Sequence, residues 1–335
     1  MVRGKRQVID SAFVKANASL DSLVAKEIIA DAVTYADELN EQSEFKITPQ
    51  PKTDKKDIDG GKKTSNKTHY SPTDPDAKIS LKPGKSCNLN YYGQVAVDDA
   101  HHVITGAKAD FADKRDSQCL KDIADQTLAN LNQNNLSIEQ LLLDTGYSSG
   151  DVLRYVEEHA IDAYIPSHGG YTQSREGFIY NKELDRYECN RGNRVILEFA
   201  GLTTDSGHTR KMYRSSSKHC KNCPLSAACL GRLTYKKITD SIDKPLYDKM
   251  HEKMQTPYAK TMARKRGKTV GPVLGTLINF LGMKRVNARG IAQASKHVMM
   301  AALSYNLKKC LRFMKRTKGL AVAMIRESML TPAFN

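Results

Sequence analysis

The apolar run Leu141–Leu143 ends abruptly at Asp144, and this change of pattern is the most informative in the chain. A short apolar run bounded by turn residues is typical of a buried strand, and Gly146 supplies such a boundary. Apolar residues then recur at helical spacing after Ser148, whose hydroxyl could cap a helix over residues 150–159. The pattern predicts a strand, an acid, a turn and a helix in succession.

Two interpretations of Asp144 follow from this position. In open α/β sheets, ligands bind beyond the carboxyl ends of the strands, so the carboxylate could hold a metal ion there. Alternatively, it could bond to the backbone of its own turn. A second acid favours the first interpretation: Asp10 lies inside a run rich in β-branched and aromatic residues, where a charge is costly unless it has a partner. If the two strands are neighbours, both acids could share divalent metal ions.

The same patterns predict the remaining elements and, through their order, the fold class. Strands alternate with helices, which indicates a mixed α/β sheet with helices on its faces. Short alternating segments after residue 168 predict a small antiparallel insertion. The predicted elements are a helix over 21–41, a hairpin with its turn at 98–101, a helix capped by Asp116 over 116–131, a short strand near 162–167, a helix starting near Thr269 with Pro272 in its first turn, and a helix over 291–314 that buries Met299, Leu303 and Leu307.

Charge suggests a polyanionic partner. The chain has 335 residues with 52 Lys and Arg against 37 Asp and Glu, a formal net charge of +15. Such an excess favours nucleic acid, although a basic protein without that partner has the same composition. No apolar stretch is long enough to span a bilayer, so we expect a soluble, cytoplasmic protein that is not associated with membranes.

Three cysteines are close together in the sequence, with the spacing C-x2-C-x5-C. They are Cys220, Cys223 and Cys229, and Cys189 upstream could complete a tetrahedral structural Zn²⁺ site. His208 and His219 are alternatives for the fourth ligand. Reduced thiols without a metal explain the spacing equally well, because the second half of the pattern is not the usual C-x2-C repeat.

Several motifs, in order along nearly the whole chain, together resemble a bacterial insertion-sequence transposase of the DDE type. They are VIDSAFVKANAS, SPTDPDAKISLKPG followed by NYYGQVAVD, LLLDTGYSS, the C-x2-C-P-L cluster and TVGPVLGTLINFLGMKRVNARGI. The resemblance implies an RNase H-like fold in which three acids bind two Mg²⁺ (or Mn²⁺) ions. A water and then a DNA 3′-hydroxyl would attack phosphodiesters of double-stranded DNA at the element ends and the target, with a homo-oligomer assembled on the DNA.

The family motifs match Asp10 to the first acid and Asp144 to the second. The third is a Glu, and that position is occupied here by Gly271, with the flanking residues still in register. No other acid follows in the chain until Glu327. We therefore expect a weakened metal site and impaired catalysis. Only nine residues precede Asp10, which leads us to expect that the family's N-terminal DNA-binding region is missing.

The expected domains follow from the motifs. Residues 1–167 begin the catalytic domain, with a basic flexible insertion at 42–86; residues 168–235 form the cysteine-containing insertion; residues 236–315 complete the catalytic domain; and residues 316–335 are a tail. Three functions remain open: an impaired DDE transposase, a non-catalytic DNA-binding remnant, and a residual metal-dependent nuclease that uses two acids.

Overall fold

The computed structural model describes residues 1–26, 64–80, 86–191, 195–205, 208–221 and 223–330. Side chains are described as far as Lys315. None of the helices in these ranges combines the length and apolar character that a membrane span requires.

Six strands of the described chain form the main sheet. Their order is β4-β5-β1-β7-β8, with β6 also paired to β5. Strand β1 is antiparallel to β5 and parallel to β7, so the sheet is mixed, as predicted. The strands are β1 (Arg6–Lys15), β4 (Lys78–Ser80), β5 (Asn88–Asp98), β6 (Val103–Phe111), β7 (Gln140–Leu142) and β8 (Asp162–Tyr164).

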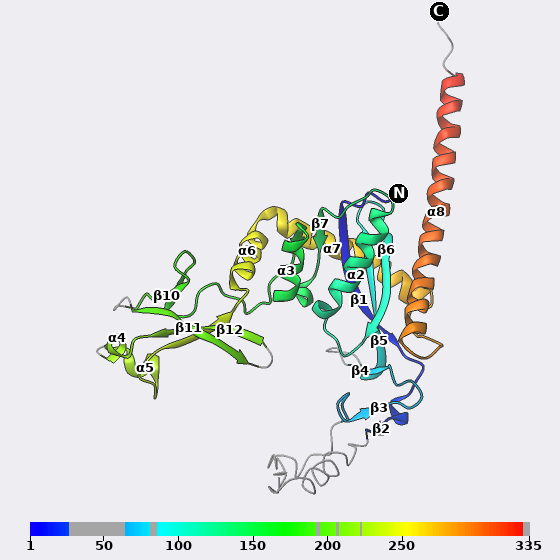
Figure 1. The fold of residues 1–335 in the computed structure, drawn as a ribbon. Coiled ribbons are helices and arrows are strands. Elements are labelled where there is room, and N and C mark those ends of the chain that lie inside the picture. The colour runs from blue at the N-terminus through cyan, green and yellow to red at the C-terminus, as the bar shows by residue number, and fades with distance from the viewer. Residues whose placement is uncertain (27–63, 81–85, 192–194, 206–207, 222, 331–335) are drawn as a thin grey trace, which may run out of the picture.

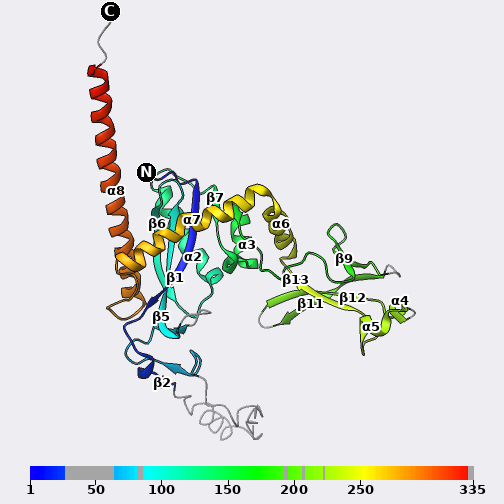
Figure 2. The same ribbon diagram turned by 180° about the vertical axis from the view of Figure 1, so that it is seen from behind.

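Helices cover both faces of this sheet because β1 is apolar on both. Val8 and Val14 belong to one core cluster, whereas Ile9 belongs to another, as expected for side chains that alternate along a strand. Figure 1 shows α2 in front of the sheet. Figure 2, which views the molecule from behind, shows α7 crossing over β1 on the opposite face. The helices are α2 (Asp116–Asn132), α3 (Gly150–Glu158), α6 (Lys244–Gln255), α7 (Pro257–Phe280) and α8 (Ile291–Leu330).

A second, antiparallel sheet of five strands forms the predicted insertion, and it lies beside the main sheet in Figure 1. Its own core includes the buried residues Tyr187, Leu197 and Tyr213. The last strand pairs with β12 and lies beyond the predicted boundary at residue 235. The elements are β9 (Phe178–Asn181), β10 (Arg186–Cys189), β11 (Ile196–Asp205), β12 (His208–Ser215), α4 (Ser217–Lys221), α5 (Ser226–Leu230) and β13 (Lys237–Ser241).

Two predictions for the N-terminal third were wrong where the structure describes it. The helix predicted from residue 21 is replaced by a 3-10 turn, η1 (Leu20–Ser22), and by β2 (Val24–Ala25), which pairs with β3 (His69–Tyr70). The rest of that helix lies outside the described residues. Within the insertion predicted at 42–86, residues 64–80 are ordered by pairing: β4 extends the main sheet through β5.

The starts of two helices also differ from the predictions. Helix α7 begins at Pro257, capped by Thr256, so Thr269 and Pro272 lie inside it. Pro272 removes one backbone donor, and the carbonyl left without it belongs to Lys268, which is solvent-exposed. Ser149, not Ser148, caps α3.

Helix α8 packs on the sheet along a narrower stripe than predicted. Ala294, Val298, Ala302 and the neighbouring Ala301 and Tyr305 are buried, whereas Met299, Leu303 and Leu307 are exposed. The prediction that these last three are core residues was wrong. Beyond the sheet the helix continues away from the body of the protein (Figure 1), so only one side of it has a surface to pack against.

Asp74 ties the 64–80 segment to the sheet and to the start of α8. Its fully buried carboxylate accepts hydrogen bonds from the Tyr91 hydroxyl (2.6 Å) and the Gly290 backbone N–H (3.0 Å). We predict that Asp74→Ala lowers the free energy of unfolding by about 1–3 kcal/mol, because the buried Tyr91 hydroxyl loses its acceptor and the Gly290 N–H keeps only its bond to that hydroxyl. Urea denaturation monitored by circular dichroism measures this. Asp113→Ala, at an exposed position, is the control; equal midpoints for the two variants would contradict the prediction.

Candidate metal-binding site

Parallel pairing of β1 with β7 brings the two predicted acids together. Val8 is paired with Leu142. Asp10 comes two residues after Val8, and Asp144 comes two residues after Leu142. Asp10 lies on the same face of β1 as Val8, the face that α7 covers. The two acids, predicted from distant segments of sequence, therefore lie side by side where β7 ends beside the middle of β1.

A single arginine bridges the two carboxylates. Arg266, on α7, donates from Nη1 to Oδ2 of Asp10 (3.1 Å) and from Nη2 to Oδ2 of Asp144 (3.0 Å). The side chains of Asp10 and Arg266 are 19% and 18% exposed, and that of Asp144 is 35% exposed. The acids therefore converge on one cation at the boundary between core and solvent.

The remaining oxygen of each acid is held by the backbone. Oδ1 of Asp10 accepts from the Ser11 N–H (2.8 Å), and Oδ1 of Asp144 accepts from the Gly146 N–H (2.9 Å). The second bond is the turn contact that formed the alternative interpretation of Asp144. This bond occupies only Oδ1 of Asp144. The residue can therefore cap the turn through Oδ1 and face a cation through Oδ2.

The surroundings of Asp10 disfavour its charge on balance. Burial raises the pKa of this carboxyl, and the nearby charges of Asp144 and Asp116 raise it further, whereas Arg266 and the Ser11 N–H lower it. The net result is a pKa above the usual range of an aspartate. A carboxyl in such a position gains from a nearby cation, which stabilises its ionised form.

A third acid, Asp116, approaches from the opposite face of the sheet. Our sequence analysis assigned it to the cap of α2, but that cap is Arg115. Asp116 instead accepts hydrogen bonds from the hydroxyls of Ser11 and Tyr92. A Cβ at Gly146 would lie 2.9 Å from Oδ2 of Asp116 and 3.1 Å from Oδ1 of Asp144, so this turn has room only for glycine beside the acids.

Gly271, at the predicted position of the third acid, is exposed on α7. It comes five residues after Arg266, which places it roughly 140° further around the helix axis. A Cβ built there meets no atom within 4 Å. The helix would therefore accept a larger side chain at this position without a steric clash.

Ion pairs at the tip of the β5–β6 hairpin fix α7 beside β1. Asp99 pairs with Arg6 (2.8 Å) and with Lys265 (2.5 Å), the neighbour of Arg266. Asp98 is buried and accepts from the Gly4 N–H (2.8 Å). Both acids therefore have structural roles at the predicted turn.

Asp10 and Asp144 suit a hard divalent cation. Magnesium prefers oxygen donors and is commonly bound through one or two carboxylates together with water and substrate phosphates. The bridging guanidinium shows that both Oδ2 atoms can face one positive charge. Among the described side chains, however, no three His, Cys, Asp or Glu residues come together as a metal-binding group.

The cysteines of the insertion lie at one end of its sheet. Cys220 is buried in the insertion core, with its Sγ 3.1 Å from the Ser215 hydroxyl, and Cys189 and Cys229 pack against the same core. All seven cysteines of the chain, each in a described range, are free thiols. No group of three metal-ligating side chains is present among the described residues here either, so zinc binding stays a prediction.

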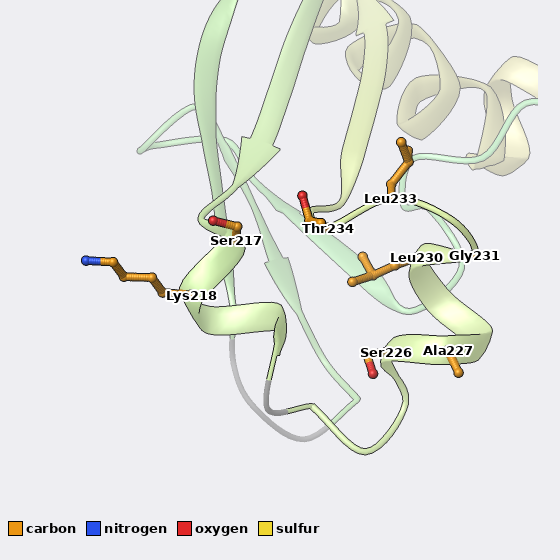
Figure 3. A pocket seen from close by; sticks show the side chains of 8 residues that line it. All are labelled: Ser217, Lys218, Ser226, Ala227, Leu230, Gly231, Leu233 and Thr234. Carbon is orange, nitrogen blue, oxygen red and sulfur yellow. The ribbon is translucent and has the colours of Figure 1, made fainter.

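Two cavities lie away from the paired acids. The first, about 630 Å³, lies between α4 and α5, and Lys218 is the one charged residue among its lining, pointing outward in Figure 3. The second, about 690 Å³, lies between α3 and the insertion, where Arg154 and Arg175 are paired with Asp243 and Asp240. Neither lining includes Asp10, Asp144 or Arg266.

Comparison with known proteins gives a family match for part of the chain. Residues 188–311 match a family model described as "Transposase DDE domain". This match supports a DDE-type transposase. The matched residues include Arg266 and Gly271 but neither Asp10 nor Asp144, and they amount to less than half of the chain. The mixed sheet flanked by helices is consistent with an RNase H-like transposase domain. No curated protein matches the chain.

Arg266 and Asp116 are the two charged residues at the site that the sequence analysis missed. Arg266 lies in the basic run RKRGK, where nothing in the sequence distinguishes it from its neighbours. The distinction comes from helix position, because Arg264 and Lys268 are exposed while Arg266 lies along the buried stripe of α7. This buried stripe could be recognised in the sequence only after the structure showed that α7 begins at Pro257.

Asp99 provides a test of how α7 is held. Burial raises the pKa of Asp99, but hydrogen bonds from Lys265 and Arg6 outweigh that effect, and the pKa is lowered on balance. A lowered pKa in the folded state gives stability that is present above the unfolded pKa and is lost as pH falls through the folded pKa. We predict that Asp99→Asn lowers the free energy of unfolding at pH 7 by about 1–2 kcal/mol.

The deficit of Asp99→Asn should shrink as pH falls below 4, because Asp99 itself then becomes protonated. Urea denaturation at pH 3, 5 and 7 measures the difference from the native sequence. Asp113→Asn, at an exposed position, is the matched control and should show no deficit. A deficit for Asp99→Asn that is independent of pH would contradict an electrostatic anchor.

Proposed function

We propose that the chain is a DDE-type transposase that cuts and joins double-stranded DNA at the ends of an insertion sequence, with Asp10 and Asp144 as its metal-binding acids. The observation that carries the proposal is the convergence of both carboxylates on one cation, where β7 ends beside β1. The match to a transposase domain and the net charge of +15 support DNA as the substrate.

The chain's own residues would position the reaction. Backbone bonds to Oδ1 fix the orientation of Asp10 and Asp144, which leaves each Oδ2 directed toward the same point. Bound Mg²⁺ would stabilise charge that develops on the attacking and leaving oxygens of a phosphodiester. The surrounding Lys and Arg residues would hold the DNA through its phosphates, independently of base sequence.

We further propose that catalysis is impaired because Gly271 supplies no carboxylate. The motif around it places the third acid of the family at this position, and α7 leaves open space there. Loss of a preorganised charge at a catalytic centre typically lowers the rate by about a hundredfold to a thousandfold. Asp116 accepts hydrogen bonds from Ser11 and Tyr92 through Oδ1 on the other face of the sheet, and we do not assign it as the replacement.

We predict that Gly271→Glu increases metal-dependent DNA cleavage by roughly a hundredfold, because it restores the third carboxylate. The measurement is Mn²⁺-dependent nicking of duplexes that carry the DNA flanking the gene. Gly275→Glu is the matched control, since it adds the same charge to the same helix at a site that is also open. Adding Asp144→Ala to Gly271→Glu should abolish the gain.

Three results would reject parts of this proposal. Equal cleavage by the native sequence and Gly271→Glu would show that Gly271 is not the position of a missing acid. Salt-dependent DNA binding without cleavage by any variant would favour a non-catalytic DNA-binding protein. Cleavage by the native sequence that is lost on Asp144→Ala would instead indicate a nuclease that uses two acids.

A further inference from the structure

The guanidinium of Arg266 occupies the oxygens that a metal ion shared by Asp10 and Asp144 would need. Both of its contacts are to Oδ2 atoms, at 3.1 and 3.0 Å. Both Oδ1 atoms already accept backbone N–H groups. Every carboxylate oxygen of the pair therefore has a donor within the chain, and a metal ion that binds both Oδ2 atoms must displace the arginine.

We propose that Arg266 is an internal counter-cation that competes with divalent metal ions and sets the metal affinity of the acid pair. This inference rests on the proposed function, because it assigns Asp10 and Asp144 as ligands. Two carboxylates close together repel one another, and one positive charge between them relieves that repulsion. A metal ion gains only the difference between its own interaction with the pair and that of the arginine.

The structure favours movement of the side chain over movement of the helix. Lys265 is tied to Asp99 at 2.5 Å, and the neighbouring residues Met262, Val270 and Val273 are buried against the sheet. The backbone at Arg266 is therefore fixed on both sides. Its long side chain is 18% exposed and can rotate toward solvent when a divalent ion takes its place.

A purely structural role is the competing explanation. If Arg266 only offset the charge of two acids during folding, its removal would lower stability and leave metal affinity unchanged. If Arg266 competes with the metal ion, its removal should raise the metal affinity. The gain in binding free energy equals that of the lost charged hydrogen bonds, which corresponds to a Kd lower by roughly tenfold to a hundredfold. Metal affinity and folding stability therefore distinguish the two roles.

The test is Mn²⁺ binding to the full-length chain without DNA, followed by the electron paramagnetic resonance signal of free Mn²⁺. We expect Arg266→Gln to bind Mn²⁺ roughly tenfold to a hundredfold more tightly than the native sequence. Arg264→Gln, an exposed arginine on the same helix, is the matched control and should leave the affinity unchanged. Arg266→Lys keeps the charge but cannot bridge both acids with one planar group. Its affinity for Mn²⁺ should therefore lie between those of Arg266→Gln and the native sequence.

Further variants separate failure of this inference from failure of the proposed function. Adding Asp144→Asn to Arg266→Gln should remove the tight site. Equal affinity of Arg266→Gln, Arg266→Lys and the native sequence, with binding still lost on Asp144→Asn, would overturn the competition and leave the metal site intact. Binding that persists with both Asp10→Asn and Asp144→Asn would overturn the metal site itself. If Arg266→Gln does not fold, as judged by circular dichroism, Arg266→Lys still decides between competition and a structural role.

Discussion

The parallel pairing of β1 with β7 is the constraint on which the rest of the site depends. The register that joins Val8 to Leu142 also sets Asp10 level with Asp144, although the two acids are far apart in the sequence. Side-chain alternation along β1 then directs Asp10 to the face covered by α7 and Ser11 to the face covered by α2. A slip of one residue would turn Asp10 toward the other face and separate the pair.

Electrostatics links this register to the packing of α7. Two partly buried acids side by side are unfavourable by themselves, and the raised pKa of Asp10 records that cost. Arg266 compensates part of it, and Asp99 holds the neighbouring Lys265. The ion pairs of Arg266 with Asp10 and Asp144 contribute little net stability because these charges must first lose water. Their main effect is to fix where one positive charge meets two negative ones.

The sequence predicted the strands that carry Asp10 and precede Asp144 well, because short-range patterns determine them. Alternation in β1 and the leucine run before Asp144 are each visible within about ten residues, and both elements are present. The fold class followed from the order of such elements. Helix boundaries were less predictable: the polar first half of α7 has no apolar period of its own, and the helix is stabilised there by Thr256 and by packing on the sheet.

Long-range contacts explain the features that the sequence did not predict. Asp116 has the local signature of a cap, and only its distance to Ser11 and Tyr92 shows its actual role. Leu303 and Leu307 have the spacing of a buried stripe but lie where α8 has no neighbour in the described structure. The family match adds support for the C-terminal half, whereas the assignment of Asp10 and Asp144 rests on motif and geometry.

A crystal structure of the chain with MnCl₂, analysed by anomalous diffraction at the manganese edge, tests most directly whether Asp10 and Asp144 form a divalent metal site. The expected result is an anomalous peak within about 2.5 Å of Oδ2 of both acids, with the Arg266 guanidinium moved away from them. A map at saturating Mn²⁺ in which Arg266 still bridges the two carboxylates, with no peak between them, would contradict the assignment.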